Sequence, residues 1–153
     1  MSRYHPAPLS TPPGTLVALR DWMLAEGANF EGYALDGRGV GEGFSVRHDG
    51  AAWLWGNEER GQWREVARFE TEAGLAAHAW AEIAADDWAW SHLVVMTDDA
   101  ERARVVAEEC RARGLVVFTD SIPYGGPDDP RHRVFVFGRG IDAVADLVQR
   151  DWI

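Results

Sequence analysis

Apolar residues in the first half of the chain recur first at a helical spacing and then at alternate positions. A helix is predicted over residues 14–25, because its apolar side chains fall three or four positions apart: Leu16, Leu19, Trp22 and Met23. Strands are predicted where polar and apolar residues alternate, over residues 30–35, 42–48, 51–55 and 63–69. Short glycine-rich turns separate these strands, which favours an antiparallel four-strand meander beside the helix.

The second half of the chain changes its periodicity. Thr71 is a predicted N-cap for an alanine-rich helix that ends near residue 85. Apolar runs then alternate with helical segments, which predicts a β-α-β-β-α order with strands at 92–96, 115–119 and 133–137 and helices at 100–113 and 141–150. A long loop rich in proline and glycine, residues 122–130, joins the last two strands.

These elements predict an α+β fold. The meander with its flanking helices is followed by the β-α-β-β-α unit, and we expect residues 14–153 to form a single domain. Two half-domains that share a core are the alternative. Residues 1–13 contain four prolines and are expected to be a flexible, extended N-terminus.

Composition narrows the classes of function. The chain has 153 residues, a net charge of −10 and one cysteine, Cys110, so it cannot form an internal disulfide. We find no apolar leader after Met1 and no run long enough for a membrane span, which predicts a cytoplasmic protein. Its negative field repels nucleic acids and anionic membranes and attracts basic surfaces. All 15 basic residues are arginine, a composition typical of a bacterial gene rich in G and C.

The residues that carry chemistry are dispersed. Glycines alternate from Gly37 to Gly43, but a predicted strand follows them, so a dinucleotide-binding turn is not expected there. The five histidines are scattered without the spacing of metal ligands. Cys110 falls late in a predicted helix, where no helix N-terminus stabilises a thiolate, and the acidic pairs are adjacent residues that point in different directions. We therefore expect no enzyme activity, no metal and no cofactor.

Eight tryptophans are unusual for a chain of this length. Trp53 and Trp55 share one face of a predicted strand, and Trp63 is expected beside them on the next. Most of the tryptophans are expected in the core, because each buries a large area. Tryptophan also dominates the energetics of protein interfaces, so exposed members of this set are candidates for partner contacts.

Two stretches resemble small bacterial immunity proteins of polymorphic toxin systems. The first stretch runs from Trp53 to Ala77 and contains Trp53–Gly61, WLWGNEERG, then Phe69–Ala73, FETEA, then Ala76 and Ala77. The second is Arg133–Arg139, RVFVFGR. The resemblance covers residues 42–150, and the chain departs from the pattern at Glu58, which is an extra acidic residue, and at Gly140. Some members of this group accompany toxins that destroy NAD.

The resemblance implies an immunity protein that binds a cognate secreted toxin and occludes its active site. We expect eight residues to make the contact, five near the end of the third strand and three in the long loop: Trp53, Trp55, Glu58, Glu59, Arg60, Tyr124, Asp128 and Asp129. A small-molecule-binding regulatory domain with a ferredoxin-like half is the alternative interpretation; it requires an apolar pocket with convergent polar groups.

Overall fold

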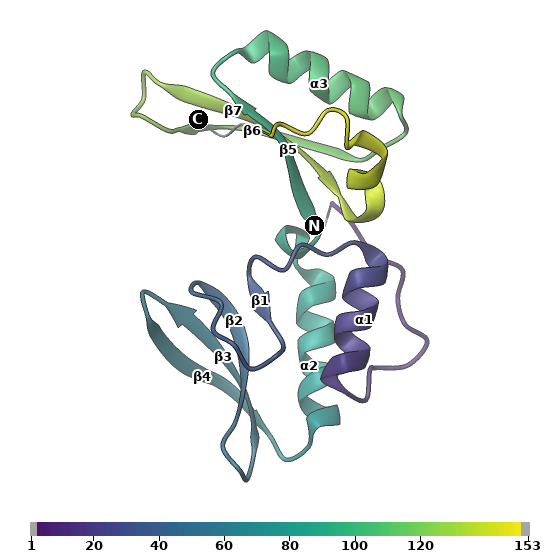
Figure 1. Cartoon of the computed structure of the whole chain (residues 1–153), viewed down its shortest axis with the longest axis vertical. Coiled ribbons are helices and arrows are strands. Elements are labelled where there is room, and N and C mark those ends of the chain that lie inside the picture. The colour runs from purple at the N-terminus through teal and green to yellow at the C-terminus, as the bar shows by residue number, and fades with distance from the viewer. Residues whose placement is uncertain (1–2, 151–153) are drawn as a thin grey trace. The chain divides into compact units, whose positions relative to one another are not determined.

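The computed structural model describes residues 3–150 and divides into two compact units, the first ending at Ala89 and the second beginning at Trp90. Each unit contains its own sheet and helices (Figure 1). The α+β class and the two successive sheets agree with the prediction from the sequence. Because the two units are separate clusters of contacts, each is described by itself.

Two helices cover the sheet of unit 1. Helix α1 (Leu16–Glu26) begins after Thr15, whose side chain accepts a hydrogen bond from the Ala18 amide, and helix α2 (Glu72–Ala85) begins after Thr71, which caps the Gly74 amide. The cap at Thr71 was predicted, and α1 begins close to the predicted helix start at residue 14. The helices pack against each other through an edge-to-face pair of indoles, Trp22 and Trp80, whose ring centroids lie 6.3 Å apart. A short 3-10 helix, η1 (Asp87–Ala89), ends the unit.

The sheet of unit 1 has the order β1-β2-β3-β4. Its strands are β1 (Tyr33–Ala34), β2 (Gly43–His48), β3 (Trp53–Glu59) and β4 (Gln62–Phe69). The last three form the predicted antiparallel meander, but β1 runs parallel to β2, so the sheet is mixed.

The parallel pairing depends on Gly43, whose backbone lies close to that of residue 32. A Cβ on Gly43, whose φ is +130°, would lie 2.3 Å from the Gly32 carbonyl oxygen, so the backbones approach closely only because this position is glycine. The Phe44 amide donates a 2.8 Å hydrogen bond to that carbonyl. The glycine-rich loop between β1 and β2 is therefore a crossover and not a hairpin turn.

The N-terminal segment of unit 1 contains neither helix nor strand over residues 3–13. We expected a flexible lead-in; the described part lies against α1 through side-chain hydrogen bonds. The Ala7 amide donates to Glu26 at 3.0 Å, and Trp22 Nε1 donates to the Ala7 carbonyl at 2.8 Å. Residues 1 and 2 lie outside the described part.

Unit 2 is built on a three-strand antiparallel sheet of order β5-β7-β6. Its elements are β5 (Ser91–Thr97), α3 (Ala100–Ala112), β6 (Val117–Pro123) and β7 (Pro130–Phe137). Helix α3 covers one face of the sheet and buries Cys110, Ala103 and Ala107 against valines of the strands (Figure 1). This is the predicted β-α-β-β order.

The segment after β7 differs from its prediction. We expected an α-helix over 141–150, whereas the structure has a 3-10 helix, η2 (Gly138–Val144), followed by turns. Ile141, Val144 and Leu147 all pack on the core cluster of unit 2 and are spaced by three residues, which matches the three residues per turn of a 3-10 helix. None of the helices among residues 3–150 is long and apolar enough to cross a membrane.

Candidate partner-binding surfaces

The β3–β4 hairpin of unit 1 presents a sharply turned, charged tip. Glu59 pairs with Gln62, and the two residues between them, Arg60 and Gly61, have φ of +51° and +75°. Positive φ at both central positions defines a type I′ turn, which fits the twist of a two-residue hairpin. Among the described residues, Arg60 is the single non-glycine residue with a positive φ. Glu59, Arg60 and Gln62 are all exposed. The turn thus holds a strained arginine in solvent, which is a feature of functional loops.

Glu58 supports the tip rather than extending from it. Its side chain is half-buried, and its Oε2 accepts a 3.1 Å hydrogen bond from the Val40 amide. The carboxylate also lies close to Gly39, where an added Cβ would be 3.2 Å from Oε2. Glu58 therefore fixes the crossover loop onto β3, next to the tip.

The two tryptophans predicted to contact a partner have different positions. Trp55 is completely buried: it stacks on Phe44 with ring centroids 5.3 Å apart, and its Nε1 donates to Glu82 of α2. It belongs to the core of unit 1 and has no surface to offer a partner, which corrects its inclusion among the candidates. Trp53 is half-buried against His48 at 4.4 Å, at the end of β3 opposite the tip.

Trp63 lies on the other face of the sheet from Trp55. The register shifts by one residue between Trp55 and Gly56, which leaves Val66 as the extra residue and pairs Trp63 with Glu58. Trp63 Nε1 donates to Ser45 at 3.1 Å, and the guanidinium of Arg47 lies 4.4 Å above its ring. Because of this bulge, Trp63, which precedes Val66, lies on the opposite face from Phe69, which follows it, and no alternation pattern in the sequence shows this.

The β6–β7 hairpin of unit 2 holds the other predicted residues. Tyr124 is 63% exposed, and the guanidinium of Arg131 lies 4.9 Å from its ring centroid. Arg131 also forms an ion pair with Asp129, which raises the pKa of that guanidinium, and the Gly125 amide donates to the Asp129 carbonyl at 3.3 Å. Asp128 is exposed. These contacts fix an aromatic ring in solvent at the end of a rigid loop.

The negative charge is concentrated in unit 1. Its sequence contains 14 acidic residues and seven arginines, whereas that of unit 2 contains 11 acidic residues and eight arginines. Unit 1 therefore carries −7 of the net −10. A basic partner would be attracted to unit 1 more strongly than to unit 2.

A network of hydrogen bonds between aromatic rings and carboxylates joins helix α2 of unit 1 to its sheet. Tyr33 donates a 2.7 Å hydrogen bond to Asp86, while Glu82, one helical turn earlier, accepts from Trp55. Burial, and then the hydrogen bond to Asp86, raise the pKa of the Tyr33 phenol. Each carboxylate is engaged by a ring donor, so the network anchors α2 to the sheet. Glu82 was not predicted as part of this network; its spacing of four residues from Asp86 was the available signal.

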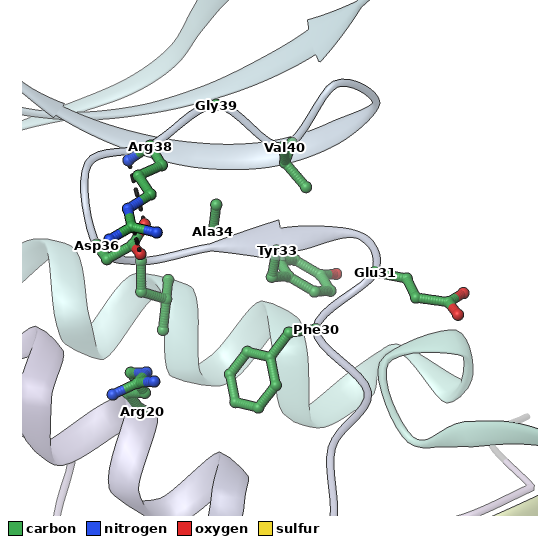
Figure 2. Close-up of a pocket in the computed structure, with 10 residues that line it drawn as sticks. Arg20, Phe30, Glu31, Tyr33, Ala34, Asp36, Arg38, Gly39 and Val40 are labelled. Carbon is green, nitrogen blue, oxygen red and sulfur yellow. Dashed lines mark hydrogen bonds and ion pairs between the residues drawn. The ribbon is translucent and has the colours of Figure 1, made fainter.

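Unit 1 also contains a pocket of about 340 Å³ between α1 and the segment around β1 (Figure 2). Phe30 and Tyr33 form its apolar side, and Arg20 and Arg38 lie at one end, where Arg38 pairs with Asp36 at 3.4 Å. Its charged residues balance, since Glu31 and Asp36 match the two arginines.

Comparison with known proteins adds no relative: no family model, curated protein or solved structure matches the chain. Among residues 3–150, no group of three or more histidine, cysteine or carboxylate side chains is arranged to hold a metal ion.

Proposed function

We propose that this protein is a bacterial immunity protein that binds a cognate secreted toxin in the cytoplasm and occludes its active site, without a reaction of its own. The tip of the β3–β4 hairpin makes the central contact. Glu59 and Arg60 are the contacting residues, Glu58 holds the tip in place, and the exposed Tyr124 loop of unit 2, with Asp128, adds a second contact.

The observation that supports this proposal is the strained, exposed turn at Arg60. A left-handed backbone costs a non-glycine residue about 1 kcal/mol, and glycine would occupy the position without that cost. An arginine held there on a hairpin has its backbone conformation fixed before binding, so the hairpin loses less conformational entropy when a partner binds.

The charge of unit 1 supports the same partner chemistry. Toxins that act on nucleic acids or dinucleotides have basic clefts, and an acidic inhibitor associates with such a cleft faster than a neutral one. Glu59 forms no ion pair within residues 3–150, so its charge is available to a partner.

The first test is whether a secreted protein is encoded immediately upstream of the gene for this chain, as the proposal expects. The C-terminal domain of that protein is then the partner to assay. The wild-type protein should bind this domain and restore growth when the two are co-expressed. Glu59→Arg should slow association by about tenfold at low salt and by less at physiological salt, because steering is screened. Absence of wild-type binding, or an unchanged association rate at low salt, would contradict the proposal.

Glu70→Arg is the matched control. Glu70 is exposed and follows the last residue of β4, about 25 Å along the hairpin from Glu59 at the rise of an extended strand. Glu70→Arg changes the net charge by the same amount as Glu59→Arg, but residue 70 lies several Debye lengths from the tip at physiological salt. An equal effect of both variants there would assign the attraction to net charge and not to the tip.

The pocket in Figure 2 favours a second candidate function, a small-molecule-binding regulatory domain. Its volume is near the lower end of the range of about 300–1,000 Å³ for ligand sites, and Phe30 with Arg20 would suit a planar anionic metabolite. A thermal-shift screen of carboxylate and phosphate metabolites tests it. A hit that Arg20→Gln removes would support this function, and an empty screen would exclude it.

A further inference from the structure

The outer edges of the two sheets are protected to different degrees. Strand β1 is only two residues long, and β4 carries three charged residues, Arg64, Glu65 and Arg68, beside its bulge. Short length, charge and bulges are the usual means by which a sheet edge is kept from pairing with another chain. Both edges of the unit 1 sheet are therefore closed to a further strand.

In unit 2 the edge at β5 is also covered. The Gln149 amide donates a 2.8 Å hydrogen bond to the Val94 carbonyl, and the Met96 amide donates to the Gln149 side chain at 3.2 Å. The segment after η2 thus occupies hydrogen-bonding positions of β5 that a further strand would need.

Strand β6 is the exception. Within residues 3–150 it pairs with β7 alone, and its only charged residue, Asp120, is bound by the guanidinium of Arg133. Its exposed positions are Thr119, Ser121 and, at its last residue, Pro123, and its pairing with β7 shows no register shift. The proline has no amide to donate, so a further strand would pair with the part of β6 before Pro123. An edge with these properties is suited to pairing with an extended chain.

A groove of about 330 Å³ lies beside this strand, between β6 and α3. It exists because the helix presents alanines there, Ala100, Ala103 and Ala107, which leave space above the sheet. Thr119 and Ser121 line it from β6, and His132 lines it from β7. An added strand places every second side chain on the α3 side of the sheet, so its side chains would enter this groove.

The arginines of the groove select the charge of its occupant. Arg104 is already held by Glu101 and Glu108, whereas Arg111 forms no ion pair with any described residue. A carboxylate that reached Arg111 would gain a charge-assisted hydrogen bond, and a basic side chain would be repelled.

We propose that an extended peptide segment of a partner protein, bearing a carboxylate side chain, binds in the groove between β6 and α3 by adding a strand to β6. Main-chain hydrogen bonds to β6 give the affinity, and Arg111 together with the alanine-lined groove gives the preference for an acidic residue flanked by small or β-branched ones. This site lies in unit 2 and does not depend on the toxin contact of the β3–β4 hairpin.

The test selects binders from a library of random peptides about nine residues long, a strand with its flanks, on the full-length protein. Enriched peptides should alternate β-branched residues with a single Asp or Glu. In a synthetic copy, N-methylation of the amides that face β6 should abolish binding, while N-methylation one residue along should leave it unchanged. No enrichment, or equal sensitivity at both sets of amides, would overturn the proposal.

Two variants locate the peptide on the protein. Arg111→Gln should weaken binding of the acidic peptide by about tenfold. It should not change binding of a control peptide whose acidic residue is replaced by glutamine, because only the carboxylate loses a charged partner. Ala100→Phe should block the groove; Ala100 is exposed at the start of α3, so the larger side chain does not enter the core. Arg102→Gln, an exposed position of α3 outside the groove, is the matched control. Circular dichroism confirms folding of each variant, and equal binding by Arg111→Gln and Arg102→Gln would refute the site.

Discussion

Gly56 is the position where a single added carbon should disturb the β3–β4 hairpin most. A Cβ on Gly56 would lie 2.1 Å from the Trp63 ring, so Gly56→Ala must displace the indole. The φ of Gly56 is not among the positive values, so backbone strain does not contribute. The effect of the substitution is therefore a direct measure of the contact between this residue and Trp63.

The expected cost follows from what Trp63 would lose. Overpacking costs about 1–3 kcal/mol, the hydrogen bond to Ser45 about 1 kcal/mol, and the stacked Arg47 about 0.5–1 kcal/mol. We expect Gly56→Ala to lower the free energy of unfolding by about 3 kcal/mol, out of the roughly 5–15 kcal/mol typical of a domain. The protein should remain folded but should unfold at a clearly lower urea concentration.

A double-mutant cycle with Trp63→Ala tests this reasoning. Once the indole is absent, Ala at position 56 meets no ring, and the loss of glycine from a strand should stabilise the sheet by about 0.5 kcal/mol. The coupling energy between the two positions should therefore be about 3.5 kcal/mol. Urea unfolding followed by far-UV circular dichroism measures all four proteins without relying on tryptophan fluorescence. An equal cost of Gly56→Ala in both backgrounds would refute the proposed contact.

Three further outcomes are expected. Arg60→Gly relieves the left-handed turn and should raise the urea midpoint slightly while weakening toxin binding; a lower midpoint would contradict strain at the tip. The raised pKa of Tyr33 stabilises the fold below pH 10, and this contribution is lost as pH rises above it, because the unfolded phenol then ionises while the folded one does not. Tyr33→Phe should therefore show a shallower alkaline fall than the wild type, whose slope includes about 1.4 kcal/mol per pH unit from this group. Burial raises the pKa of the Cys110 thiol, so a thiol reagent should label it at the rate of unfolding, and rapid labelling of native protein would show that it is accessible.

Local signals in the sequence were sufficient for most elements of the fold. Thr71 starts α2 as predicted, and α1 starts after Thr15, close to the predicted start at residue 14, since a capping side chain acts on amides only two or three residues away. The order of strands and helix in unit 2 up to β7 follows from periodicity. The prediction of an α-helix after β7 was wrong. Ile141, Val144 and Leu147 fit the three-residue period of a 3-10 helix as well as the roughly 3.6-residue period of an α-helix, and only the core they pack against selects between the two.

The candidate site was predicted less completely. The resemblance, together with the polar connectors before and after the predicted strands, pointed to Glu59, Arg60 and Tyr124, all of which are exposed in the structure, since such connectors lie at surfaces. The sequence could not show that Trp53 and Trp55 differ in burial. Both side chains face the same side of β3, and only the position of Glu82 on α2 decides which indole is covered.

The sequence by itself determined the α+β class, the helix starts, the strand order of the meander and the acidic character of the surface, since each depends on neighbouring residues or on summed composition. Tertiary structure alone decided the parallel pairing of β1, the bulge that moves Trp63 across the sheet, the burial of Trp55, and the groove beside β6. Each of these depends on the close approach of segments distant in the sequence, as at Gly32 and Gly43, and such contacts leave no periodic trace in the chain.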